Sequence, residues 1–183
     1  MGRLTDIANR HTVDKGTEHY EKHGYTEVYD KYIPENGEFV LLEIGVWHGD
    51  SLRMWKEYNP QLTIHGVDID KNVRNFVNDT DGVSLHIGDQ SDVKFMEDVI
   101  RLSGSPNFII DDGSHHHSHI IESFKILWEH LQPKGFYFIE DLHAPHAQRD
   151  VTMQDILDWL IFNDIKYSSI DLTCDDKLLI IQK

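Results

Sequence analysis

The sequence has little of three features that would assign a chain to particular protein classes: cysteine, positive charge and long apolar runs. A single cysteine, Cys174, is present among 183 residues, so no disulfide can form within the chain, which agrees with the reducing cytoplasm that we expect as its location. The 17 lysines and arginines are outnumbered by 32 aspartates and glutamates, and no basic patch interrupts the resulting formal charge of −15. This acidity opposes contact with a phosphate backbone, so we expect no nucleic-acid partner.

No apolar run approaches the ~20 residues that a membrane-spanning helix needs, and residues 1–20 lack the apolar core of a signal peptide. We therefore expect no membrane partner. What the sequence does have is 39% hydrophobic residues, which recur in periodic runs without a repeat or a low-complexity linker. A chain of this length and composition predicts a single domain over residues 1–183 with its own hydrophobic core.

Short runs rich in branched apolar residues alternate along the chain with segments of helical periodicity. Strands are predicted at residues 39–45, 62–69, 83–89, 107–112 and 136–141. Helices are predicted at residues 51–58, 71–78, 92–102, 115–131 and 152–163. Residues 168–183 predict a hairpin of two strands. This order is typical of βαβ units, so we predict an α/β, Rossmann-like fold: a mostly parallel seven-stranded sheet with helices on both faces and a C-terminal antiparallel hairpin.

Several side chains near these elements have an expected position. Phe76 and Val93 fall at helical spacing with other apolar residues and are expected to face the core. Ser114 precedes the helix predicted at 115–131 and is expected to be its N-cap. Trp47 and Trp128 are expected to be packing residues rather than ligand contacts.

A carboxylate lies at or near the end of every predicted parallel strand. These residues are Glu43, Asp68, Asp89, Asp111, Asp112, Glu140 and Asp141. In an open α/β sheet, ligands bind beyond the carboxyl ends of the strands, so these acids would meet at the ligand edge. The preference of aspartate for turns and helix N-caps explains one or two of them but explains all five strand ends poorly.

A glycine turn follows the first predicted strand. Gly45 and Gly49 lie between this strand and the next helix, where glycine lets a ligand approach the backbone closely. The turn is not the G-x-G-x-x-G fingerprint, because Trp47 occupies the place of the second glycine. Asp68 lies 19 residues beyond Gly49, at a spacing suited to a ribose hydroxyl. Together with the GD pair that ends at Asp89, this pattern indicates a nucleoside-containing ligand.

The longer motifs around these residues resemble a known family. The stretches LEIGVWHGDSLRMW, IHGVDID, GDQSD and IIDDGSHHHSHIIESFKILWEHLQPKGFYFIEDL, with the upstream DKGTEHYEKHGYTEVY, are similar to class I S-adenosylmethionine (SAM) dependent methyltransferases. Within that class, the chain resembles the metal-dependent macrolide sugar O-methyltransferases of the mycinamicin and macrocin type. Cephalosporin hydroxylase-like proteins share the same signature. The resemblance runs from about residue 12 to residue 142.

The resemblance implies roles for individual residues. The residues that would hold Mg²⁺ are Asp112, Glu140 and Asp141, and His115 would be the general base. The implied contacts of SAM are Lys15, Tyr20, Glu43, Gly45, Gly49, Ser51, Asp68, Asp89 and Asp111. Residues 1–38 would cover the cofactor and substrate. Apart from the resemblance, His119 is expected either to face the substrate or to support a residue that does, and His143 is expected to face the substrate because it follows the fifth predicted strand in a loop, where substrate contacts usually lie.

Elementary chemistry agrees with these roles. Carboxylates that meet at one edge repel each other unless a cation lies between them, and oxygen ligands favour a hard ion such as Mg²⁺. A histidine beside them suits proton removal near neutral pH. We therefore predict an enzyme that transfers a methyl group from SAM to a hydroxyl of a small acceptor, a sugar or a glycosylated natural product.

Three alternatives stay open at this point. The histidine run suggests zinc, because His115 and His119 have the i, i+4 spacing of helical zinc pairs, whereas His116 and His117 are expected to face solvent. The scaffold could also serve a metal-dependent hydrolase or hydroxylase, or a non-catalytic SAM-binding module. About 38 residues precede the first predicted strand, fewer than in larger members, so we expect the acceptor pocket to be shallow or completed by a second copy in a homo-oligomer.

Overall fold

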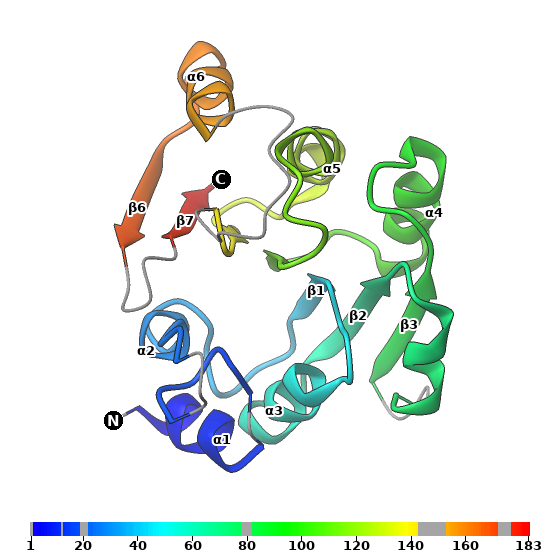
Figure 1. The fold of residues 1–183 in the computed structure, drawn as a ribbon, viewed down its shortest axis with the longest axis vertical. Helices are drawn as coiled ribbons and strands as arrows, with labels where there is room; N and C mark the ends of the chain where they lie inside the picture. Colours follow the sequence, from blue (N-terminus) through cyan, green and yellow to red (C-terminus); the bar gives the residue numbers. More distant parts are fainter. Residues whose placement is uncertain (1, 12, 19–21, 78–81, 143–152, 172–176) are drawn as a thin grey trace.

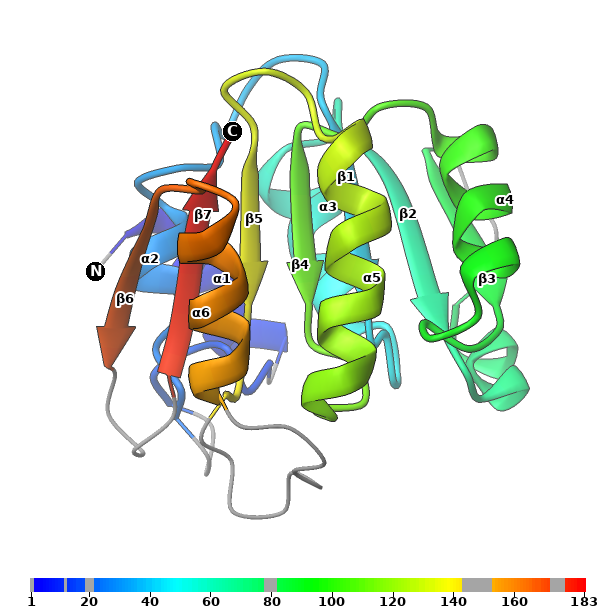
Figure 2. The same cartoon turned by 90° about the horizontal axis from the view of Figure 1, so that it is seen from above.

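The fold is built on one seven-stranded sheet. The computed structural model describes the chain except for residues 1, 12, 19–21, 78–81, 143–152 and 172–176. The strands are β1 (Val40–Ile44), β2 (Thr63–Asp68), β3 (Val83–Ile87), β4 (Phe108–Asp111), β5 (Phe136–Ile139), β6 (Tyr167–Asp171) and β7 (Lys177–Gln182). Their order across the sheet is β3-β2-β1-β4-β5-β7-β6, which Figure 2 shows from one edge to the other.

Strand direction follows the prediction from the sequence. Strands β1 to β5 are parallel to one another, and β7 pairs antiparallel with both β5 and β6. The predicted mostly parallel sheet with a C-terminal antiparallel hairpin is therefore confirmed. The register places Ile44 at the end of β1 opposite Val67 of β2 and Asp111 of β4. The segments that follow these strands consequently begin side by side at one edge of the sheet.

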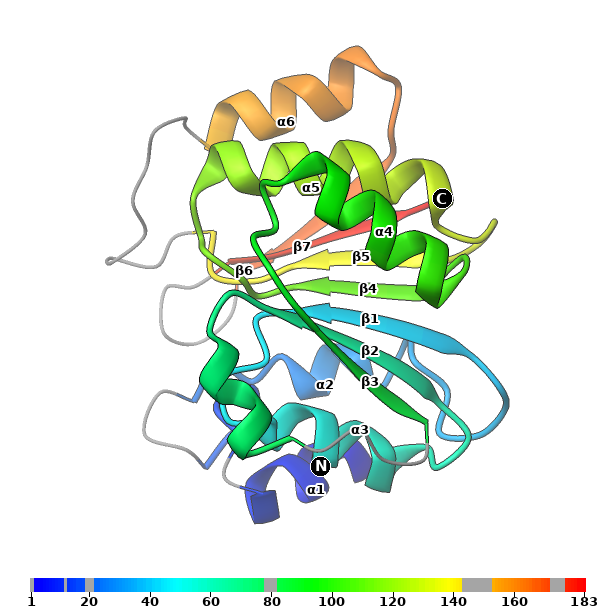
Figure 3. The same ribbon diagram turned by 90° about the vertical axis from the view of Figure 1, so that its right-hand side faces the viewer.

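Helices cover both faces of the sheet, as the sequence predicted (Figures 1 and 3). One face carries α1 (Arg3–His11), α2 (Thr26–Tyr29) and α3 (Asp50–Tyr58), with the short 3₁₀ helix η1 (Lys71–Asn75) beside β2 and β3. The opposite face carries α4 (Val93–Ser103), α5 (His117–His130) and α6 (Met153–Phe162).

Two hydrophobic cores, one on each face, hold these layers together. Alternation along β1 divides its side chains between them, since Leu41 belongs to the core under α1, α2 and α3 and Leu42 to the core under α4, α5 and α6. The N-terminal helices are part of the first core, because Leu4 and Tyr29 are fully buried within it. Helices α1 and α2, which precede the first strand, are thus packed into the fold.

Three expectations about helices were wrong. The segment predicted as a helix at 71–78 forms only the 3₁₀ turn Lys71–Asn75, and Phe76 just after it is 50% exposed. Val93 is also exposed, because it is the first residue of α4, directly after the N-cap Asp92, where the helix has not yet reached the sheet. Ser114 is not the cap of α5: this helix starts at His117 with His116 as N-cap, since His115 has a positive φ of 56° that no α-helix accommodates.

No helix within the described ranges is long and apolar enough to cross a bilayer.

Candidate functional site

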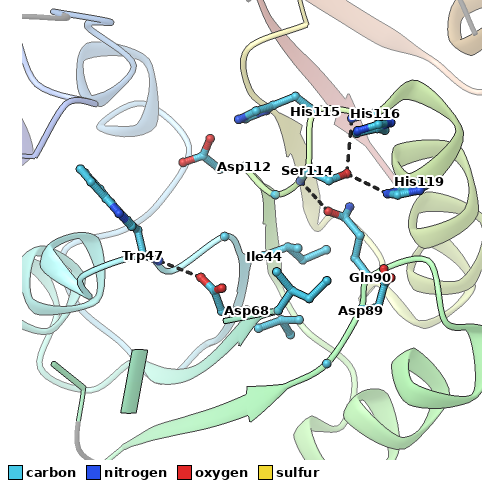
Figure 4. Close-up of a pocket in the computed structure, with 15 residues that line it drawn as sticks. Ile44, Trp47, Asp68, Asp89, Gln90, Asp112, Ser114, His115, His116 and His119 are labelled. Carbon is cyan, nitrogen blue, oxygen red and sulfur yellow. Dashed lines mark hydrogen bonds between the residues drawn. The ribbon is translucent and has the colours of Figure 1, made fainter. Parts of the chain in front are cut away.

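A cavity of about 550 Å³ lies beyond the carboxyl ends of β1 to β4. Its lining comprises Ile44, Gly45, Trp47, Val67, Asp68, Ile69, Gly88, Asp89, Gln90, Asp112, Gly113, Ser114, His115, His116 and His119. Figure 4 shows Trp47, Asp112 and His115 toward one end of this cavity and Asp89, Gln90 and His119 toward the other. Of the seven acids predicted to meet at this edge of the sheet, Asp68, Asp89 and Asp112 line this cavity.

The glycine turn after β1 is held against two neighbouring strands. Gly45 has a φ of 86°, and a Cβ there would lie 1.9 Å from the carbonyl oxygen of Asp112, so only glycine fits. The Asp68 carboxylate accepts hydrogen bonds from the backbone N–H groups of Val46 and Trp47, each at 2.9 Å. Asp68 thus shapes the turn while also lining the cavity, as its predicted contact with a nucleoside requires.

Asp89 occupies the far wall of the cavity. Its Oδ1 accepts hydrogen bonds from both the backbone N–H and the hydroxyl of Ser91, each at 2.8 Å. The backbone hydrogen bond, reinforced by that of the hydroxyl, lowers the pKa of Asp89, so the residue is a carboxylate at neutral pH. A fixed acceptor is therefore available at this end of the cavity.

Asp111, predicted to contact the cofactor, lies beneath the cavity and is not part of its lining. It is 1% exposed, and its carboxylate accepts hydrogen bonds from Gln90 at 3.1 Å, Ser123 at 3.0 Å and Tyr137 at 3.3 Å. Burial raises the pKa of Asp111, although the hydrogen bonds from Gln90 and Ser123 oppose this shift. Gln90 also accepts a hydrogen bond from the backbone N–H of Ser114 at 2.8 Å, which ties the buried carboxylate to the loop after β4.

The loops after β4 and β5 bring three possible metal ligands together. One ligand atom each from Asp112, His115 and Asp141 lie within 4.8 Å of one another, the one such group of three in the described part of the chain. Both His115 and Asp141 have left-handed backbone conformations, with φ of 56° and 54°. Non-glycine residues in this region cost about 1–3 kcal/mol each and cluster at functional sites. The predicted base and two of the three predicted metal ligands therefore share one centre.

Glu140, the third predicted metal ligand, faces the N-terminal segment instead. Its carboxylate accepts a hydrogen bond from the Lys15 ammonium at 2.8 Å and another from the Tyr29 hydroxyl. Lys15 also contacts the Asp112 carboxylate and is only 2% exposed. Burial opposes the charge on Lys15, but the carboxylates of Asp112 and Glu140 outweigh this effect and raise its pKa. Lys15 is therefore an ammonium ion embedded in the acidic centre.

Glu43 lies behind this centre with no exposed surface. Its Oε2 accepts a hydrogen bond from the indole N–H of Trp55 at 3.1 Å, while its Oε1 has no hydrogen-bond partner in the described residues and lies 4.0 Å from the Lys15 ammonium. Burial raises the pKa of Glu43 to about 7, against the opposing effect of Lys15. Lys15 and Ser51 line a small hollow of about 50 Å³ that shares Gly45 and other residues with the main cavity.

The histidine run does not form a zinc cluster among the residues described. His116 and His119 stack on each other with ring centroids 4.8 Å apart, and both line the cavity. His117, expected to face solvent, is 1% exposed, because it begins α5 on the side that packs against the sheet, and neither ring nitrogen has a hydrogen-bond partner within the described chain. The expectation of two solvent-facing histidines was therefore wrong for His117, and His116 faces the cavity.

The two tryptophans expected to be packing residues differ. Trp128 packs against the core under α4, α5 and α6, as predicted. Trp47 is 65% exposed, lines the cavity and stacks on His48 at 4.3 Å, so the expectation was wrong for it. Its backbone is left-handed, with a φ of 46°. Tyr20 and His143, predicted to contact the cofactor and substrate, lie outside the described residues.

Two tyrosines of the acidic centre were missed in the sequence. The hydroxyl of Tyr25 donates to Asp141 and that of Tyr29 donates to Glu140. They lie four residues apart in the GYTEVY stretch, so helical spacing places both hydroxyls on one side. That spacing was the available signal, but local sequence does not show which acids they meet.

Comparison with known proteins identifies relatives of the chain. The family model described as a methyltransferase domain matches residues 42–142. Mycinamicin VI 2''-O-methyltransferase of Micromonospora griseorubida is 38% identical over 132 residues, which are 66% of this chain and 32% of that protein. Demethylmacrocin O-methyltransferase of Streptomyces fradiae is 34% identical over 149 residues, 76% of this chain and 36% of that protein. The chain thus spans about a third of the length of these curated relatives.

Solved structures give the same result. The MycE methyltransferase of the mycinamycin biosynthetic pathway, solved in complex with Mg, SAH and mycinamycin VI, is 30% identical to this chain with a TM-score of 0.73. The match covers 96% of this chain and 53% of MycE. The predicted resemblance to macrolide sugar O-methyltransferases is therefore confirmed.

Proposed function

The chain belongs to the methyltransferase family, and from this premise we propose that it transfers a methyl group from SAM to a sugar hydroxyl of a small acceptor, with the help of Mg²⁺. One observation carries the proposal: the glycine turn, the cavity and the acidic centre are continuous, with Asp112 belonging to both the cavity wall and the centre. A methyl donor and an activated hydroxyl can therefore meet there. The cavity volume lies within the range of ~300–1,000 Å³ that small-molecule sites occupy.

The residues of the cavity fit the two ends of SAM. Asp68 and Asp89 provide acceptors for the hydroxyl and amino groups of a nucleoside, and the turn at Gly45 lets the ligand approach the backbone. The small hollow beside Lys15 and Ser51 suits the amino-acid end, since Glu43 behind it has one carboxylate oxygen without a hydrogen bond among the described atoms. These contacts, and the predicted contact at Gly49, are part of the proposal.

The donor set at the other end fits a hard divalent cation. Asp112 and Asp141 offer carboxylate oxygens at a short mutual distance, and the imidazole of His115 lies beside them, where it can accept a proton. When bound, Mg²⁺ would lower the pKa of an acceptor hydroxyl. Glu140 joins this set in the proposal once its carboxylate turns from Lys15 and Tyr29.

The reaction then needs little covalent work from the protein. The acceptor oxygen attacks the methyl carbon, the C–O bond forms as the C–S bond breaks, and His115 takes the hydroxyl proton. The cavity walls hold donor and acceptor in line, a proximity effect that can lower the barrier by about 7–11 kcal/mol. His119, which lines the cavity, is proposed to face the acceptor.

The acceptor class follows from the relatives. The names of several relatives specify sugar-bearing acceptors, such as a rhamnosyl tetracenomycin C and L-olivosyl-oleandolide, and O-methyl transfer. None of these names describes a hydrolase, a hydroxylase or a protein without catalysis, so those alternatives are not favoured. The cytoplasmic location and the homo-oligomer stay predictions.

The test combines binding with methyl transfer. Calorimetric titration with SAM should give saturable binding, and methylation of mycinamicin VI or demethylmacrocin, followed by mass spectrometry, should require Mg²⁺ and stop with EDTA. Asp112→Ala should lower the rate more than ~100-fold, because even residues that only support metal ligands contribute 10–100-fold. The control Asp98→Ala removes an exposed aspartate of α4 and should leave the rate unchanged. Absence of SAM binding would overturn the proposal.

A further inference from the structure

Lys15 is the one cation described inside the acidic centre. Its ammonium group contacts the Asp112 carboxylate, lies 2.8 Å from Glu140 and lies 4.0 Å from Glu43. The side chain is 2% exposed, so these contacts are made away from water and are weakly screened. A buried lysine is stable only when anionic groups compensate its charge, which these carboxylates do.

The partners of Lys15 overlap with the proposed metal ligands. Asp112 and Glu140 are two of the three carboxylates assigned to Mg²⁺, and both are already bonded to Lys15. The second oxygen of Glu140 accepts a hydrogen bond from Tyr29, so both oxygens of this carboxylate are engaged. The group of three whose ligand atoms lie close together, Asp112, His115 and Asp141, lacks Glu140 and includes the Asp112 that Lys15 contacts.

The charges of the centre explain why a cation must be present. Four carboxylates, those of Glu43, Asp112, Glu140 and Asp141, lie around it, and Lys15 supplies a single positive charge. A divalent ion would be attracted by the carboxylate oxygens that this single charge does not compensate. It would also be repelled by the ammonium group, which holds the same carboxylates at hydrogen-bond distance.

We propose that Lys15 is an internal counter-ion that competes with the divalent cation for Asp112 and Glu140, so that metal binding displaces Lys15 from the centre. This inference rests on the proposed function, because that function assigns the metal to these carboxylates. It gives Lys15 a regulatory position rather than a catalytic one. The acidic centre stays neutralised without metal, and its affinity for metal is lower than the carboxylates alone would give.

Displacement also connects the metal to the N-terminal segment. The backbone around Lys15 is anchored, since Gly16 N–H donates to the carbonyl of Val13 and the carbonyl of Lys15 accepts from Thr26 N–H. A departing ammonium group therefore moves by rotation of its own long side chain.

Calorimetric titration of Lys15→Met with MgCl₂ and MnCl₂, without SAM, tests the competition. Methionine keeps the length and apolar stem of lysine but has no charge. Removal of a positive charge at this distance should tighten divalent binding at least about tenfold relative to the wild-type chain. The control Lys31→Met removes an exposed lysine and should leave the affinity unchanged. Equal or weaker binding by Lys15→Met would overturn the proposal.

A second measurement uses the unaltered protein, in case Lys15→Met does not fold without metal. Reductive methylation of lysines, followed by peptide mass spectrometry, reports how accessible each ammonium group is. Lys15 should be protected in EDTA and modified several-fold faster with saturating Mg²⁺, while Lys31 should react equally in both. Protection of Lys15 that is unchanged or greater with Mg²⁺ would contradict displacement.

The same samples separate this inference from the proposed function. Titration of the wild-type chain with SAM shows whether the methyltransferase site works; the Lys15→Met chain is not used for this titration, because Lys15 is itself an expected SAM contact. If SAM binds but the metal affinity is unchanged in Lys15→Met, the proposed competition between Lys15 and the metal is wrong and the methyltransferase proposal is unaffected. Tighter metal binding in Lys15→Met without any SAM binding would do the reverse. Absence of divalent binding in both chains would overturn the competition.

Discussion

Glu43 is the residue whose environment gives the clearest expectation of how stability depends on pH. Its pKa is about 7 in the folded chain, because burial disfavours the carboxylate, against an ordinary value of 4.5. Between these two values the folded state binds more protons at Glu43 than the unfolded state does. The free energy of unfolding therefore falls as the pH rises through this window.

The variant Glu43→Gln removes this titration. In the presence of EDTA, it should gain stability over the wild-type chain on going from about pH 5 to about pH 8, by an amount on the order of 2–3 kcal/mol. Urea unfolding at both pH values measures the difference. Glu57→Gln is the control, since Glu57 lies on the surface and its pKa is lowered by the hydrogen bond from His11. A difference between wild type and Glu43→Gln that does not change with pH would contradict the assignment.

At the scale of residues, the sequence predicted which acids form the site better than it predicted which residues hydrogen-bond to those acids. The acids at the ends of β1, β2, β3, β4 and β5 were predictable, because parallel strands bring their carboxyl ends to one edge. The partners Tyr25 and Tyr29 were not, since their bonds to Asp141 and Glu140 join parts of the chain more than 100 residues apart. The exposure of Trp47 depends on a backbone angle that its sequence does not reveal.

Among the connecting elements, the loop after β4 depends on Gln90 in the loop after β3. Gln90 donates to the buried Asp111 at 3.1 Å and accepts from the backbone N–H of Ser114 at 2.8 Å. Gly113 leaves room for it, since a Cβ there would lie 2.1 Å from the Gln90 carbonyl oxygen. One amide therefore fixes the loop that carries Asp112 and His115.

Gln90→Glu should disrupt this connection with almost no change in shape. The new carboxylate cannot donate to Asp111 and repels it, so we expect a loss of about 2–4 kcal/mol in the free energy of unfolding, together with weaker Mg²⁺ binding. Urea unfolding and calorimetry measure the two effects. Gln182→Glu, at an exposed position of β7, should change stability by less than ~0.5 kcal/mol. If Gln90→Glu matched that control, the amide would not be fixing the loop.

Element boundaries show where sequence patterns stop being informative. The five parallel strands and the final hairpin were predictable because short apolar runs at this spacing are typical of strands in a sheet. The start of α5 was misplaced by two residues because His115 adopts a left-handed conformation, which apolar periodicity does not report. In place of the helix predicted at 71–78 the structure has only η1, because Phe76 is exposed and does not pack into the core.

For the whole molecule, the segment before β1 is part of both the core and the site. It supplies Leu4 and Tyr29 to the core under α3, and Lys15 to the acidic centre. The family model begins at residue 42 and leaves this segment out. Residues 1–38 therefore have a structural role in the core, in addition to their proposed role of covering the cofactor and substrate.

Deletion of residues 1–38 should prevent stable folding. The apolar face of the sheet would be exposed, and the buried carboxylates of Glu43 and Glu140 would lose their cation. We expect no cooperative urea transition by circular dichroism and association of the shortened chain in size-exclusion chromatography. A shortened chain that unfolds cooperatively at the wild-type urea concentration would show that the segment is only a cover.

The left-handed residues Trp47, His115 and Asp141 have a consequence for protein engineering. Each occupies a backbone conformation that glycine adopts with less strain, so each lowers the stability that the fold would otherwise reach by about 1–3 kcal/mol. All three stand in the loops that surround the cavity and the acidic centre. A screen that selects only for heat resistance would accept glycine at these positions. Its product would be a more stable protein that has lost the functional side chains of the site.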